Sequence, residues 1–108
     1  MQYQSTRGAS LGHFSDILLQ GLAPDGGLAM PAHIPEIITP ATLREWKNHS
    51  YADLAFAVMR HYIDDIPEND LRCILHRSYH ETVFHSEAIT PLTRLGDSDT
   101  YLLELSNG

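Results

Sequence analysis

Between Ser50 and Tyr79 the apolar residues recur at helical spacing, and this stretch constrains the fold more than any other part of the chain. Ser50 is a good N-cap for a first helix, and Pro67 suits the first turn of a second one. The expected apolar faces are Leu54, Ala55, Val58, Met59 and Tyr62 on the first helix, and Leu71, Ile74, Leu75 and Tyr79 on the second. We expect these two helices to form the core, with Trp46 as a further anchor.

Two more helices and several short strands complete the predicted pattern. One helix begins with Ser15 as N-cap and ends at Gly21, and another begins at Thr39 or Pro40 and runs through Trp46. Residues 2–7, 28–30, 91–95 and 101–105 have the composition of strands, and the turn cluster at 96–99 predicts that the last two form a hairpin. The predicted fold class is α+β, with about four helices and a short antiparallel hairpin or small sheet.

Charge and length exclude several classes of protein. The 108 residues fit one domain, and 7 Lys and Arg against 14 Asp and Glu give a net charge of −7. Nucleic-acid binding requires clustered positive charge, so that partner is not expected, and neither is an anionic membrane. A single cysteine, Cys73, and the lack of a signal pattern or membrane span predict a cytoplasmic protein.

Few residues offer chemistry of their own. His76 and His80 are four residues apart, with Glu81, His85 and Glu87 nearby, but helical spacing brings together only two of the three or four ligands that zinc needs. We therefore predict no metal site. Cys73 is interpreted as a small apolar residue on a helix, and Asp25-Gly26-Gly27 as a plain turn.

The hydroxyls and guanidinium of Ser5, Thr6 and Arg7 suit phosphate or carboxylate, although alone they equally fit a solvated strand end.

Taken in order, several segments resemble the threonine synthase family. They are residues 3–8, 14–15, 20–28, 51–59, 89–92 and 103–108. The run Gly-Leu-Ala-Pro-Asp-Gly-Gly-Leu at 21–28 is the most specific of them, and the resemblance extends over the whole chain.

The resemblance implies the N-terminal domain of a fold-type II enzyme that uses pyridoxal phosphate (PLP). Such an enzyme converts O-phosphohomoserine and water to threonine and phosphate. In the family, a segment like the one ending at Gly108 leads into the lysine that forms the Schiff base, with Asn107 standing where the family often has histidine. We therefore expect residues 1–108 to be one domain, without catalytic or cofactor-binding residues and inactive alone, with the PLP-binding domains beyond it. The only lysine, Lys47, lies on a polar stretch and is a poor substitute.

The resemblance also suggests which residues approach the active site of the complete enzyme, namely Ser5, Thr6, Arg7, Asn107 and Gly108. The expected partners are the PLP-binding domains of the same polypeptide and O-phosphohomoserine, together with weak self-association of the isolated chain through exposed strand edges. Two alternatives stay open at this point. One is a stand-alone interaction module, and the other is a threonine-synthase-like phospholyase.

Overall fold

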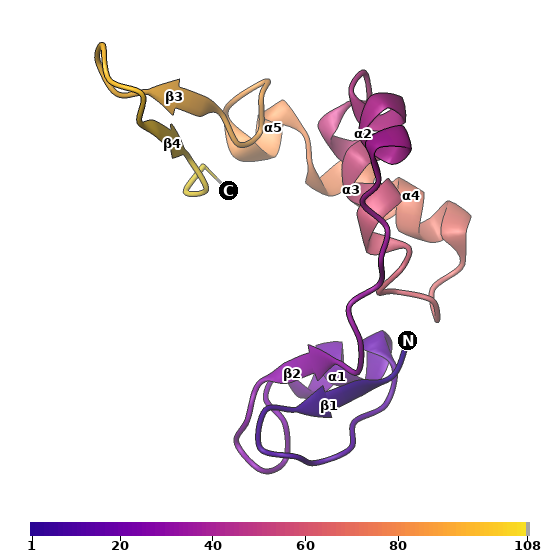
Figure 1. The fold of residues 1–108 in the computed structure, drawn as a ribbon. Coiled ribbons are helices and arrows are strands. Elements are labelled where there is room, and N and C mark those ends of the chain that lie inside the picture. The colour runs from indigo at the N-terminus through magenta and orange to yellow at the C-terminus, as the bar shows by residue number, and fades with distance from the viewer. Residues whose placement is uncertain (108) are drawn as a thin grey trace.

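The computed structural model describes residues 1–107, which form five helices and four short strands (Figure 1). The helices are α1 (Phe14–Gln20), α2 (Pro40–Trp46), α3 (Tyr51–Met59), α4 (Glu68–Ser78) and α5 (Glu81–Phe84). The strands are β1 (Tyr3–Ser5), β2 (Ala29–Pro31), β3 (Leu92–Arg94) and β4 (Tyr101–Leu103). This arrangement confirms the predicted α+β class.

The chain is more extended than a compact domain of its length. The radius of gyration of its Cα atoms is 16.5 Å, whereas about 13 Å is expected for a compact chain of this size. Figure 1 shows the reason: β1, β2 and α1 form one part, α2, α3 and α4 a second, and the β3–β4 hairpin extends beyond α5 as a third.

Helix α2 begins at Pro40, one of its two predicted starts, with Thr39 as its N-cap, and α3 follows the predicted cap Ser50. The Thr39 hydroxyl accepts a hydrogen bond of 3.1 Å from the Thr42 amide, and the Ser50 hydroxyl accepts one of 3.2 Å from the Asp53 amide. Each bond satisfies an amide of the first turn that has no partner within the helix. Pro67 precedes α4 as its N-cap residue, directly before the first turn.

The predicted start of α1 is wrong by two residues. The N-cap is His13, whose amide donates to the Asp16 carboxylate at 2.9 Å. Ser15 instead directs its hydroxyl and its amide to Asp65, on the loop between α3 and α4. The predicted end is confirmed at Gly21, which follows the helix with a positive φ of 76°.

One helix was not predicted. The four residues of α5 follow His80, whose ring nitrogen Nδ1 accepts from the Thr82 amide at 3.3 Å. Such a short turn has no repeating apolar face, so hydrophobic spacing gives no signal for it.

The largest buried cluster lies between α3 and α4. Its members are Phe56, Ile63, Leu71 and Leu75. The predicted apolar face of α4 is therefore confirmed at Leu71 and Leu75, but Ile74 remains 48% exposed. Trp46 is only half-buried and is not one of the buried residues of this cluster, so its predicted role as a core anchor is not confirmed.

A second, smaller cluster holds the N-terminal part together. Strands β1 and β2 pair antiparallel, with Tyr3 opposite Pro31 and Ser5 opposite Ala29. The buried residues are Tyr3, Leu11 and Ala23. Phe14 of α1 packs against both this cluster and the one between α3 and α4, so α1 lies where the two parts meet.

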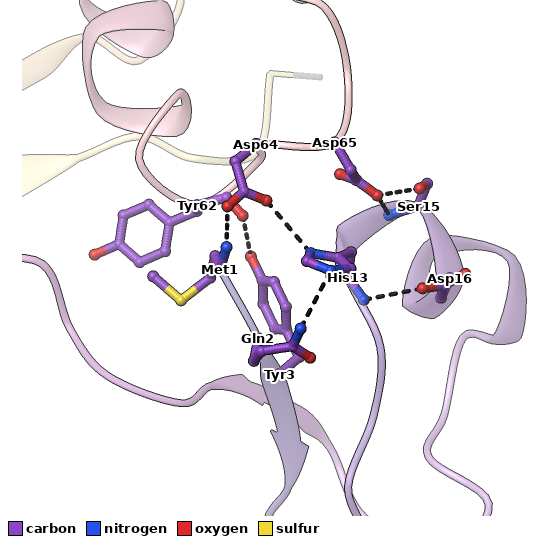
Figure 2. A network of polar contacts seen from close by, with 9 residues as sticks. All are labelled: Met1, Gln2, Tyr3, His13, Ser15, Asp16, Tyr62, Asp64 and Asp65. Carbon is purple, nitrogen blue, oxygen red and sulfur yellow. Dashed lines mark hydrogen bonds and ion pairs between the residues drawn. The ribbon is translucent and has the colours of Figure 1, made fainter.

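Polar contacts also join these two parts (Figure 2). The Tyr3 hydroxyl donates to the backbone carbonyl of Tyr62 at 2.8 Å. The Met1 amine contacts the Asp64 carboxylate, and His13 lies 3.5 Å from the same carboxyl group. The loop that carries Tyr62 and Asp64 is thereby attached to the N-terminal part.

The predicted hairpin is confirmed, with shorter strands than expected. Leu92 of β3 lies opposite Leu103 of β4, and Arg94 lies opposite Tyr101. Every residue of both strands is exposed, including the leucines.

None of the helices within residues 1–107 has the length and hydropathy of a membrane-spanning segment.

Candidate functional site

The pairing of β1 with β2 brings the segment of Ser5, Thr6 and Arg7 against the turn at residues 24–28. Thr6 and Leu28 are joined twice: the Thr6 amide donates to the Leu28 carbonyl at 2.9 Å, and the Leu28 amide donates to the Thr6 hydroxyl at 3.0 Å. Two loops that are about twenty residues apart in sequence therefore form one polar site.

Asp25 is the centre of this site. Its carboxylate accepts from the Ser5 hydroxyl at 2.6 Å, from the Gly27 amide at 3.0 Å and from the Ala9 amide at 3.1 Å. The Ser5 hydroxyl, followed by the Gly27 amide, lowers the pKa of Asp25 below its ordinary value, because both donors favour the charged form. Ser5 itself is buried, with 4% of its surface exposed.

Two glycines allow the loops to approach this closely. A Cβ atom on Gly27 would overlap the Ser5 hydroxyl oxygen. A Cβ atom on Gly26 would lie 3.0 Å from Nη1 of Arg7, and Gly26 has a positive φ of 78°, which side chains rarely adopt. The segment predicted as a plain turn is therefore a packed polar site, in which both glycines are required.

Arg7 is the exposed charge of the site. Its backbone amide donates to the Ser5 hydroxyl at 3.0 Å, and Nη1 donates to the backbone carbonyl of Asp25 at 3.1 Å. Arg7 is exposed to solvent. The site thus presents a guanidinium that is held in place by its neighbours.

The structure brings together three of the five residues predicted to approach an active site. Ser5, Thr6 and Arg7 are adjacent, but the Ser5 hydroxyl is directed to Asp25 and not to solvent. Asn107 is half-buried at the C-terminal end, which Figure 1 places well away from β1. Gly108 lies outside the described residues.

The sequence signals Ser5, Thr6 and Arg7 through their side-chain types, but it does not signal Asp25. Asp25 is twenty residues from Ser5 and is followed by two glycines, so it has the appearance of an ordinary turn residue. Only the strand pairing shows that it bonds to the other loop.

The candidate metal ligands have other roles. His76 contacts the Asp53 carboxylate at 2.9 Å, and His80 caps α5. Among residues 1–107, no three His, Cys, Asp or Glu side chains are grouped so that they could hold a metal ion. Cys73 lies on α4, the predicted helix, and its side chain is exposed.

The residues present do not fit PLP by themselves. A Schiff base requires a lysine held against the cofactor. The only lysine in the sequence is Lys47, which is exposed and directly follows α2. Neither Lys47 nor the site around Asp25 supplies both an amine and a phosphate cradle.

Comparisons with known proteins give a consistent result. The family model described as threonine synthase N terminus matches residues 2–79. Threonine synthase from Methylobacillus glycogenes is 47% identical over 100% of this chain and 24% of its own length. Threonine synthase from Corynebacterium glutamicum is 47% identical over 100% of this chain and 23% of its own length.

A solved structure is also similar over the whole chain. The crystal structure of PLP-bound threonine synthase from Brucella melitensis matches with a TM-score of 0.84 and 36% identity, over 100% of this chain and 23% of that one. The chain therefore spans about a quarter of the length of the relatives that it matches.

Proposed function

Because the chain belongs to the threonine synthase family, as its N-terminal domain, we propose that the protein containing it is a PLP-dependent threonine synthase. The proposed reaction converts O-phosphohomoserine and water to threonine and phosphate. The observation that supports it most is the family match over residues 2–79, together with 47% identity over the whole chain to a threonine synthase. The similar Brucella melitensis protein is described as PLP-bound.

PLP supplies the electron sink for such an elimination and replacement when it is bound. Since residues 1–107 do not fit the cofactor, we place its binding in the remaining three quarters of the polypeptide. Residues 1–108 then form one N-terminal domain that packs against PLP-binding domains of the same chain.

The β3–β4 hairpin supports this arrangement. Leu92 and Leu103 project from one face of the two-stranded sheet and Leu102 from the other, and they are 64%, 52% and 51% exposed. A two-stranded hairpin is marginally stable alone, and exposed leucines on both of its faces are stabilised when other elements cover them. We propose that the following domains cover it.

Cysteine labelling in the full-length protein tests this packing. We expect Leu102→Cys and Leu103→Cys to react slowly with a thiol reagent in the native state. Thr100→Cys, near the turn of the same hairpin, is the matched control and should react quickly. Equal rates at all three positions would overturn the packing.

Self-association of the isolated chain follows from the same exposed leucines, and we retain it as a proposal. It predicts that dilution of the isolated chain lowers its mass in sedimentation. A chain that stays monomeric at high concentration would contradict it.

A cytoplasmic location is likewise proposed, on the basis of the biosynthetic reaction and the single cysteine. Fractionation of the source cells tests it.

Genetic complementation tests the proposed reaction. The full-length gene should restore growth without threonine to a bacterial strain that lacks its own threonine synthase. The same gene without codons 1–108 is the matched control and should not, because the hairpin and the site around Asp25 would be missing. A full-length protein that is produced and folded but gives no growth would contradict the proposal.

A further inference from the structure

Among the six arginines, Arg7 combines a side-chain hydrogen bond with the lack of a carboxylate partner, whereas Arg44 and Arg77 show neither kind of contact in the described residues. Arg60, Arg72 and Arg94 each lie near a carboxylate, at 3.2, 3.8 and 3.9 Å. Within residues 1–107, no carboxylate lies in ion-pair range of Arg7, whose side chain instead donates to a backbone carbonyl. A guanidinium has five N–H donors, so Arg7 retains donors for a ligand.

The neighbours of Arg7 hold it in place. The Ser5 hydroxyl accepts from the Arg7 amide and donates to the Asp25 carboxylate, which fixes the backbone on both sides. Gly26 leaves the space in which the guanidinium lies. A cation that is already ordered loses less conformational freedom when it binds an anion.

The nearby Asp25 carboxylate accepts its hydrogen bonds from groups other than the Arg7 guanidinium. Both oxygens of the Asp25 carboxylate accept from other groups, one from Ser5 and Gly27 and the other from Ala9. It is the backbone carbonyl of Asp25, not its carboxylate, that accepts from the guanidinium. An incoming anion therefore meets a positive group on the exposed side of the site.

We propose that Arg7 binds an oxyanion of the substrate, and that Asp25 and Ser5 are the residues that position it. The oxyanion class follows from the guanidinium, since planar N–H donors match the oxygens of phosphate and carboxylate. The ligand's identity rests on the proposed function, because O-phosphohomoserine carries both groups. Binding to Arg7 brings this site against the PLP-binding domains in the complete protein.

Calorimetry on the full-length, PLP-loaded protein tests the site without requiring turnover. Inorganic phosphate probes the phosphate subsite and L-homoserine the carboxylate subsite, while bound PLP keeps its own phosphate pocket filled. We expect Arg7→Gln to raise the dissociation constant of one of these probes about tenfold to a hundredfold, the usual effect of losing hydrogen bonds to a charged group. The affected probe identifies the oxyanion.

Three further variants separate positioning from general stability. Arg7→Lys should restore part of the affinity, because it keeps the charge but not the planar donors. Asp25→Asn should raise the dissociation constant of the same probe severalfold in the otherwise unchanged protein. It should have no further effect on that constant in a protein that already carries Arg7→Gln. Arg77→Gln removes an exposed charge from α4 and should leave both dissociation constants unchanged.

Unchanged affinity for both probes in Arg7→Gln would overturn the inference. If that variant also melted earlier, Arg7 would instead pair with a carboxylate elsewhere in the polypeptide. A protein that binds phosphate through Arg7 but makes no threonine would contradict the proposed function and leave the oxyanion site standing.

Discussion

The Tyr3 hydroxyl donates a hydrogen bond of 2.8 Å to the backbone carbonyl of Tyr62, across a sequence separation of 59 residues (Figure 2). Tyr3 is buried in the N-terminal cluster, whereas Tyr62 packs against the cluster between α3 and α4. This single bond therefore joins the two parts of the chain, next to the contacts of Asp64 and Asp65.

Tyr3→Phe should lower the free energy of unfolding by about 0.5–1.5 kcal/mol, because the Tyr62 carbonyl loses its donor. Urea unfolding of the full-length protein measures the change. Tyr62→Phe is the matched control, since it removes a hydroxyl but keeps the backbone carbonyl that accepts from Tyr3. Equal effects of the two substitutions would show that the bond does not join the two parts.

Acid should selectively weaken the site around Asp25. Its pKa is lowered in the folded protein, chiefly by the Ser5 hydroxyl, so the stabilisation is present above the ordinary pKa of about 3.9 and is lost as the pH falls through the folded value. The difference in stability between the parent and Asp25→Asn should therefore narrow as the pH falls below about 4. Unfolding curves from pH 7 to pH 3 measure it, and a constant difference would contradict the account.

Gly27→Ala should destabilise the N-terminal part by about 1–3 kcal/mol, the usual cost of overpacking a close contact. The added Cβ would overlap the Ser5 hydroxyl and displace it from Asp25. Hydrogen exchange should then increase at the amides of Ala9 and of position 27, which donate to the same carboxylate. Retained protection of both amides would show that the loops are packed less closely than described.

Leu71→Ala should cost about 2–5 kcal/mol, because Leu71 is 3% exposed in the main cluster and its removal leaves a cavity. Ile74→Ala, three residues along the same helix, is the control. Within residues 1–107, 48% of the Ile74 surface is exposed, so truncating its side chain should lower the free energy of unfolding much less. If the full-length protein lost more stability from Ile74→Ala, that side chain would be buried by another domain.

Features set by neighbours in sequence were predictable. The start of α2 at Thr39 or Pro40 and the cap of α3 at Ser50 each depend on a hydroxyl and an amide three residues away, and both were predicted correctly. The hairpin was signalled by its turn cluster. By contrast, α1 has His13 as its N-cap, and Ser15 directs its hydroxyl and amide to Asp65, fifty residues away. No local pattern contains that contact.

The candidate site divides in the same way. Ser5, Thr6 and Arg7 were identified by their chemistry, and the turn at 24–28 by its proline and glycines. Their connection through Asp25 depends on the register of β1 and β2, which places Ser5 opposite Ala29. Three-residue strands carry too little alternation to fix that register from the sequence.

The central claim is that this chain is the N-terminal domain of a threonine synthase. Its most direct test is to incubate the purified, PLP-loaded full-length protein with O-phosphohomoserine and to quantify threonine, phosphate and ammonia together. The account predicts one threonine for each phosphate released and no ammonia. Phosphate with ammonia and no threonine would identify a phospholyase instead, and no phosphate at all would contradict the assignment.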